Sequence, residues 1–166
     1  LDQIEPTVRF IGAVNTILND KGRLIGYNTD GSGALKALKE NGITPNGKKL
    51  ILLGAGGAGK AIAFHAAQEV EELVILNRTP QKAKNLAEVL HKEYNKKIYG
   101  KTLSTEIIEE ELKDANILVN ATAVGMHPNI DQSLVSQSLL RPDLYVMDIV
   151  YNPIETKLAK DAKAVG

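Results

Sequence analysis

The glycine-rich stretch at residues 53–61, LGAGGAGKA, limits what this chain can fold into more than any other segment. A continuous apolar run, KKLILLG at 48–54, precedes it, and a segment with helical spacing follows at 58–69. The apolar run is typical of a strand buried on both faces of a parallel sheet. Glycines between such a strand and a helix allow a tight turn in which the backbone approaches a bound phosphate. We therefore predict a phosphate-binding loop at the end of a buried parallel strand.

Two phosphate-binding motifs fit these glycines. Gly54, Gly56 and Gly59 match G-x-G-x-x-G, the motif of dinucleotide-binding folds, and the stretch from Gly54 to Lys60 also matches G-x-x-x-x-G-K of nucleoside triphosphate loops. The triphosphate loop needs a hydroxyl after its lysine to hold Mg²⁺, and that position is Ala61. The sequence therefore favours a dinucleotide site over an ATP- or GTP-hydrolysing domain. A tight turn that binds nothing is the remaining alternative.

Further apolar runs and helical patterns alternate along the chain. Three more buried strands are predicted, at 72–77, 115–122 and 144–151. Helices are predicted at 58–69, at 31–41 after Asp30 as N-cap, and from Pro80 onward after Thr79 as N-cap. Strands that alternate with helices are typical of parallel sheets with right-handed crossovers. We therefore predict an α/β fold with a Rossmann-like, doubly wound parallel sheet.

A different pattern occupies residues 9–28, RFIGAVNTILNDKGRLIGYN. Two short apolar runs flank turn residues at Asn19–Gly22, which predicts a β-hairpin. This hairpin precedes the alternating pattern and has no helix between its strands.

The composition narrows the class of partner. The chain has 166 residues with 20 basic and 20 acidic side chains, so no overall field attracts nucleic acid or an anionic membrane. A small molecule is the expected partner. The absence of cysteine excludes a disulfide scaffold, a thiolate zinc site and a cysteine nucleophile, and favours a cytoplasmic location. The three histidines have no metal-like spacing with carboxylates, so no metal site is predicted.

The end of the strand predicted at 72–77 indicates which dinucleotide would bind. A cofactor with a free ribose 2′-hydroxyl usually meets an acidic residue there. This chain has Asn77, Arg78 and Thr79 instead, with Lys82 close behind. Arg78 can pair with a 2′-phosphate that an acid would repel, so the sequence favours NADP over NAD. The alternative is that Arg78 and Lys82 are solvated surface charges and Thr79 only caps a helix.

Six motifs together resemble those of a known family. They are GAVNT (12–16), GYNTDGSG (26–33), GAGGAG (54–59), NRT (77–79), NATAVGM (120–126) and DIVYNP (148–153), and in this order they resemble the signatures of the shikimate dehydrogenase family. The resemblance implies an oxidoreductase that reversibly reduces 3-dehydroshikimate to shikimate with NADPH, in aromatic amino acid biosynthesis. It also implies a substrate lobe and a cofactor lobe. Residues 1–29 would be a remnant of the substrate lobe, and residues 30–166 the NADP-binding Rossmann domain.

The resemblance also assigns roles to individual residues. Asn15 would bind substrate hydroxyls, Asp30 would act beside a lysine at the hydroxyl being oxidised, and Tyr151 would reach the substrate from the cofactor lobe. The residues implied in cofactor binding are Gly54, Ala55, Gly56, Gly57, Ala58, Asn77, Arg78, Thr79, Lys82, Thr122, Val124 and Ile149. Each substrate residue has a structural alternative: Asp30 as a helix cap, Asn15 as a turn residue and Tyr151 as an interfacial aromatic.

The family's lysine and its serine-rich substrate motif would lie upstream of Leu1, and a substrate-binding glutamine would lie downstream of Gly166. The resemblance therefore implies that this chain is a piece of a longer protein, which binds NADP(H) without turnover when isolated. Three questions stay open on the sequence. The enzyme could be a quinate/shikimate dehydrogenase using NAD or NADP, the chain could be a non-catalytic NADP-binding module, and the intact protein could be a monomer or a homodimer.

Overall fold

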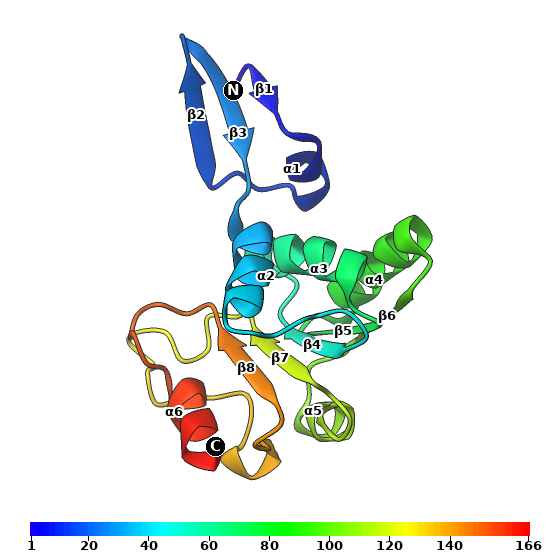
Figure 1. Cartoon of the computed structure of the whole chain (residues 1–166), viewed down its shortest axis with the longest axis vertical. Helices are drawn as coiled ribbons and strands as arrows, with labels where there is room; N and C mark the ends of the chain where they lie inside the picture. The colour runs from blue at the N-terminus through cyan, green and yellow to red at the C-terminus, as the bar shows by residue number, and fades with distance from the viewer.

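A computed structural model describes all 166 residues and contains two separate sheets (Figure 1). The larger sheet has five parallel strands in the order β6-β5-β4-β7-β8. Their bounds are β4 Lys49–Leu53, β5 Glu72–Asn77, β6 Lys97–Thr102, β7 Ile117–Asn120 and β8 Tyr145–Asp148. The predicted α/β fold with a parallel Rossmann-like sheet is confirmed.

Helices cover both faces of this sheet. One face carries α2 (Asp30–Glu40), α3 (Gly57–Glu69) and α4 (Pro80–Tyr94), and the other carries α5 (Thr105–Leu112), a short 3₁₀ helix (Gln137–Leu139) and α6 (Lys157–Val165). Residues of β4 alternate between the two cores: Leu50 and Leu52 pack on the first face, and Ile51 and Leu53 on the second. Because both faces are covered by apolar side chains, these strands read as continuous apolar runs in the sequence.

The strand order reverses at the centre of the sheet. The chain passes from β4 to β5 and β6 in one direction, and then returns to place β7 on the other side of β4. In open α/β sheets, ligands bind in the crevice beyond the carboxyl ends of the strands at this reversal. The glycine-rich loop, which follows β4, lies at that crevice.

The smaller sheet comes from the first 27 residues. It comprises β1 (Gln3–Ile4), β2 (Thr16–Asp20) and β3 (Arg23–Tyr27), in the order β1-β3-β2. The hairpin predicted around Asn19–Gly22 is confirmed, since β2 and β3 are antiparallel and both Lys21 and Gly22 have positive φ angles. Such angles form the two-residue turn that suits the twist of a hairpin.

Two local predictions were wrong. Residues 9–11 belong to helix α1 (Pro6–Ile11) and not to a strand, and Pro6 occupies its first turn as proline often does. Asp30 is not the N-cap of the following helix. Thr29 is the N-cap, and Asp30 is the first helical residue, which leaves its carboxylate for other contacts. Neither β6 nor α5 was predicted.

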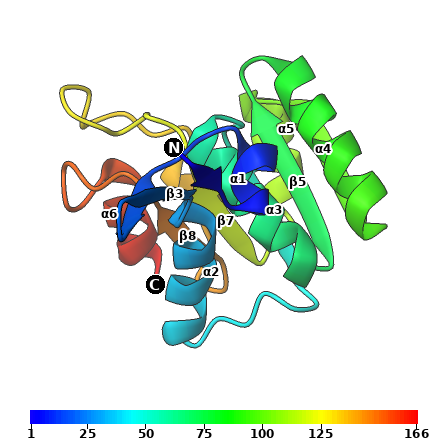
Figure 2. The ribbon, with the colours of Figure 1, turned by 90° about the horizontal axis from the view of Figure 1, so that it is seen from above.

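Helix α2 connects the small sheet to the large sheet along the chain, and helix α1 packs on α3 of the large sheet. Seen from above in Figure 2, β3 lies over α2 and helix α1 lies over α3. Phe10 of α1 packs on Phe64 of α3, with ring centroids 5.1 Å apart, and Tyr94 at the end of α4 meets Phe64 edge-on. No helix of the structure is long and apolar enough to cross a membrane.

Candidate functional site

The carboxyl ends of the parallel strands bring the polar motifs together. Asn77 ends β5, Asn120 ends β7 and Asp148 ends β8, while the glycine-rich loop follows β4. All four ends meet at one edge of the sheet because the strands are parallel and in register. This edge is the candidate site.

The three glycines of the motif have different surroundings. Gly54 has a φ of +104°, and a Cβ there would lie 2.7 Å from the carbonyl oxygen of Ala121. A Cβ on Gly59 would collide with the carbonyl group of Gly54, so glycine is needed for the helix to pack on the turn. At Gly56, by contrast, no atom lies within 4 Å of the position of a Cβ. The loop is thus closed toward the protein at Gly54 and Gly59 and open at Gly56, where a phosphate would approach.

The first turn of α3 offers backbone donors at this opening. Gly56 is the N-cap and has no side chain to satisfy them, and the first helical bond runs from the Lys60 N–H to the Gly56 carbonyl, at 2.8 Å. The first turn carries no acidic residue. Free N–H groups and the positive end of the helix dipole bind phosphate groups well. Gly57 and Ala58 therefore lie where the sequence motif requires them.

Asn77 connects the glycine loop to the start of α4. Its Oδ1 accepts a hydrogen bond from the Ala55 N–H at 3.0 Å, and its Nδ2 donates to the Thr79 carbonyl at 3.0 Å. Thr79 is the N-cap of α4 and Pro80 its first residue, as predicted. Arg78 and Lys82 are exposed and form no salt bridge, so both cations are available to a ligand.

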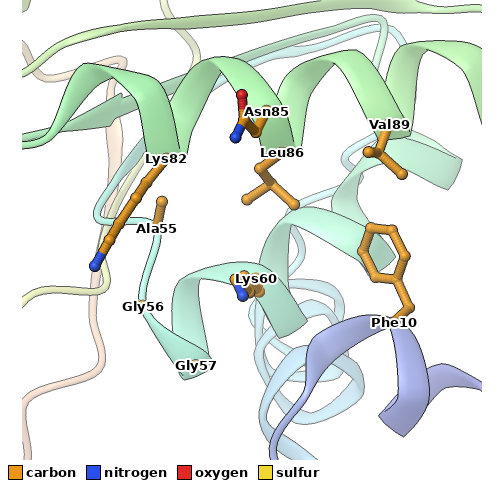
Figure 3. A pocket seen from close by; sticks show the side chains of 9 residues that line it. All are labelled: Phe10, Ala55, Gly56, Gly57, Lys60, Lys82, Asn85, Leu86 and Val89. Atoms are coloured by element: carbon orange, nitrogen blue, oxygen red, sulfur yellow. The ribbon is translucent and has the colours of Figure 1, made fainter.

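A first pocket of about 410 Å³ runs along the groove between α3 and α4 (Figure 3). The glycine loop closes one end and Phe10 of α1 the other. Its lining residues are Phe10, Ala55, Gly56, Gly57, Lys60, Lys82, Asn85, Leu86 and Val89. The pocket brings Lys82 together with three of the predicted loop residues. Phe10 and the apolar residues of α4 were not anticipated from the sequence.

Asn120 organises the loops on the other side of β4. It is 3% exposed, and its Oδ1 accepts hydrogen bonds from the N–H and the hydroxyl of Thr122. Its Nδ2 donates to Asp148 at 3.0 Å and to the Val124 carbonyl at 3.3 Å. Asp148 also accepts the hydroxyl of Thr156 at 2.7 Å. Asn120 and Asp148 lie in the motifs NATAVGM and DIVYNP, but the sequence analysis assigned neither residue a role. Both are polar residues at the ends of predicted strands, and that position could have identified them.

A second pocket of about 540 Å³ lies between α2, α3 and the end of β8. Its lining residues are Thr29, Asp30, Gly33, Ala34, Ala37, Ala58, Ile62, Met147, Asp148, Ile149 and Tyr151. Four of them, Asp30, Ala58, Ile149 and Tyr151, were predicted site residues. Tyr151 is 86% exposed, so its ring has few contacts within the chain.

Asn15 and Asp30 lie in direct contact. The Asn15 Nδ2 donates to the Asp30 Oδ1 at 2.5 Å, and the Asn15 Oδ1 accepts from the Thr29 N–H at 3.0 Å and the Thr16 hydroxyl at 2.9 Å. Asn28 supports this arrangement, because it accepts from the Asp30 N–H and donates to the Ala13 carbonyl. The start of the hairpin and the start of α2 are therefore held together by their polar side chains.

The histidines lie outside this network. His65 is partly buried on α3, and burial lowers the pKa of its imidazole although Glu5 and Glu69 act in the opposite direction. The His91 ring contacts the Lys96 carbonyl at 2.7 Å. No group of three or more histidine, cysteine, aspartate or glutamate side chains is arranged to hold a metal ion.

The model of the shikimate / quinate 5-dehydrogenase family matches residues 36–164. The chain belongs to this family. A family relative, the shikimate dehydrogenase (NADP(+)) of Methanosarcina barkeri (strain Fusaro / DSM 804), is 45% identical over 164 residues, which cover 98% of this chain. The chain spans 58% of the length of that relative.

Two solved structures of the shikimate dehydrogenase family extend the match to three dimensions. A crystal structure of a shikimate dehydrogenase in complex with NADP⁺ has a TM-score of 0.87 and 43% identity, covering 99% of this chain and 57% of the other. The shikimate 5-dehydrogenase of Listeria monocytogenes, in complex with shikimate and NAD, has a TM-score of 0.88 and 39% identity, covering 100% of this chain and 60% of the other.

Proposed function

We propose that this chain carries the NADP-binding lobe, and part of the substrate lobe, of a shikimate dehydrogenase. The protein would reversibly reduce 3-dehydroshikimate to shikimate. The observation that carries this proposal is the glycine loop, which is open at Gly56 and free of acids, beside Arg78 at the strand end where an NAD site has a carboxylate. The relative of Methanosarcina barkeri and the first solved structure are named with NADP⁺, which supports NADP as the cofactor, and all three names include shikimate.

The residues present fit a dinucleotide. The N–H groups of the first turn of α3 would bind its diphosphate, Arg78 and Lys82 its 2′-phosphate, and Asn77 would shape the adenosine side by fixing Ala55. The loops that Asn120 and Asp148 hold, with Thr122, Val124 and Ile149, would border the nicotinamide. The bound nicotinamide supplies hydride transfer, and the protein supplies position and proton transfer.

The substrate side would be formed by Asn15, Asp30 and Tyr151. Asp30 lines the second pocket, and one of its carboxylate oxygens accepts a hydrogen bond from Asn15. These contacts support a role for Asp30 at a substrate hydroxyl. Hydride transfer at a secondary alcohol requires a proton to move at its oxygen, and a positioned acid or base speeds that step. We assign residues 1–29 to the substrate lobe and 30–166 to the cofactor lobe. The balanced charge and the absence of cysteine support a small-molecule partner and a cytoplasmic location.

Titration calorimetry with NADP⁺ and NAD⁺ tests the cofactor assignment. We expect the chain to bind NADP⁺ about 10- to 100-fold more tightly, because a charge-assisted pair forms only with the 2′-phosphate. Arg78→Ala should remove most of this preference and leave NAD⁺ binding nearly unchanged. Gly56→Val should abolish binding of both cofactors, since its side chain would occupy the space that the diphosphate needs. Equal affinities of the unmutated chain for the two cofactors would refute the assignment and favour a dehydrogenase of relaxed cofactor choice.

A further inference from the structure

Lys60 is the residue that the proposed function leaves without a role. It follows the last glycine of the motif, where it fits a triphosphate loop that Ala61 makes unsuitable. In the structure it is partly buried, forms no salt bridge and lines the first pocket. The ammonium of Lys60 is therefore not committed to a carboxylate of this chain.

The two sides of α3 face different pockets. Ala58 and Ile62, four residues apart, line the second pocket with Asp30 and Tyr151. Lys60 lies between them in sequence and therefore points to the opposite side, toward α4 and the first pocket. A dinucleotide that crosses the sheet edge has its nicotinamide on the β8 side and its adenosine on the β5 side. Lys60 is thus on the adenosine side.

The first pocket is positively charged and has no compensating acid. Lys60 stands on one wall and Lys82 on the other, and no aspartate or glutamate is among the nine lining residues (Figure 3). Lys82 lies in the first turn of α4, which contains no acid either. A cation near a helix N-terminus is unfavourable for the helix, so this arrangement is better explained by an anionic ligand than by stability.

We propose that Lys60 is a third cation of the 2′-phosphate site, acting with Arg78 and Lys82, and that it contributes to the choice of NADP over NAD. The inference rests on the proposed function. A 2′-phosphate carries a charge of about −1.5 to −2 at neutral pH, more than one arginine neutralises. The diphosphate already has the backbone donors of the first turn of α3, whereas Lys60 begins the next turn on the side that faces Lys82.

Calorimetry of Lys60→Met tests the proposal, because methionine keeps the aliphatic stem and removes the charge. We expect its Kd for NADP⁺ to rise about tenfold while the Kd for NAD⁺ stays within about twofold, since a charged hydrogen bond is lost with one ligand only. Lys60→Arg should restore most of the NADP⁺ affinity. Lys84→Met is the matched control: Lys84 is an exposed lysine of α4 outside the first pocket, and its loss should change neither Kd.

Two fragments of the cofactor locate the contact. Adenosine 2′,5′-bisphosphate carries the 2′-phosphate, and ADP carries only the diphosphate. Lys60→Met should weaken the binding of adenosine 2′,5′-bisphosphate and leave the binding of ADP unchanged. An equal loss for both, or for NADP⁺ and NAD⁺ alike, would place Lys60 on the diphosphate and overturn the inference, as would unchanged binding of all four ligands. If the unmutated chain binds neither cofactor, the proposed function itself fails.

Discussion

The two sheets differ in how much of their own apolar surface this chain buries. Leu50 to Leu53 of β4 are completely buried, because helices of the same chain cover both faces. Every residue of β2 is exposed, including Ile17 at 59% and Leu18 at 49%. The parallel sheet therefore has a complete core of its own. The small sheet leaves apolar side chains of β2 exposed, and Asn15, directly before β2, contacts Asp30 of α2.

The largest effect is expected where the two sheets meet, at Asp30. If the proposed function holds, Asp30→Asn should lower the kcat for shikimate oxidation about 10²- to 10⁴-fold, because the variant keeps an acceptor for Asn15 and loses the charge to which the proposal assigns proton transfer. Shikimate oxidation is followed by the absorbance of NADPH, and calorimetry should show unchanged NADP⁺ binding. An unchanged kcat would restrict Asp30 to holding Asn15 in place.

The next prediction compares the cores of the two sheets directly. Leu52→Ala in β4 should lower the free energy of unfolding by about 3 kcal/mol, because it leaves a cavity in a fully buried site. Ile17→Ala in β2 should cost about 0.5 kcal/mol or less, since the side chain is mostly solvated. Urea unfolding measures both. A large loss for Ile17→Ala would mean that β2 is covered in solution.

A smaller effect is expected on the face of the sheet away from the first pocket. Glu111 of α5 is buried, contacts Lys49 at 2.9 Å and forms a second ion pair with Lys101. Glu111→Gln should lower the free energy of unfolding by about 2 kcal/mol, because Lys49 and Lys101 lose a buried counter-charge. The loss is limited because Lys49 keeps its ion pair with Asp114. Glu109→Gln, at an exposed position of the same helix, is the matched control.

The pH dependence of unfolding gives an independent measure of Glu111. Burial opposes its ionisation, but hydrogen bonds from Lys101 and Lys49 outweigh burial and lower the pKa of the carboxyl. A carboxyl with a lowered pKa in the folded state stabilises the fold above its unfolded pKa of about 4.3, and this contribution is lost as the pH falls further. The unfolding free energy of Glu111→Gln should therefore fall less between pH 6 and pH 3 than that of the unmutated chain.

The same difference in burial explains which elements could be predicted. The runs that became β4 and β5 are continuously apolar at 50–53 and 73–76 because both faces of the sheet are covered there. Strand β6 lies at the edge, and its lysines at 97 and 101 break such a run. Helix α1 is only six residues long, so Phe10 and Ile11 looked like strand residues.

The candidate site was predictable where one motif contains all its parts. The glycine loop is local, and its turn follows from Gly54 and Gly59. The hydrogen bond from Asn120 to Asp148 joins residues 28 positions apart, and Phe10 reaches the first pocket through the packing of α1 on α3. Such contacts depend on topology, and no spacing in the sequence specifies them.

The side chain of Asn77 affects how this protein could evolve. Its two hydrogen bonds have opposite sense: Oδ1 accepts from Ala55 and Nδ2 donates to the carbonyl of Thr79. An aspartate at position 77 would keep the first bond but would set a carboxylate oxygen against that carbonyl, so an acidic residue at the end of β5 would strain the glycine loop. Under laboratory selection for activity with NAD, substitutions should therefore appear first at Arg78. Asn77 should be retained, because the glycine loop depends on its two hydrogen bonds.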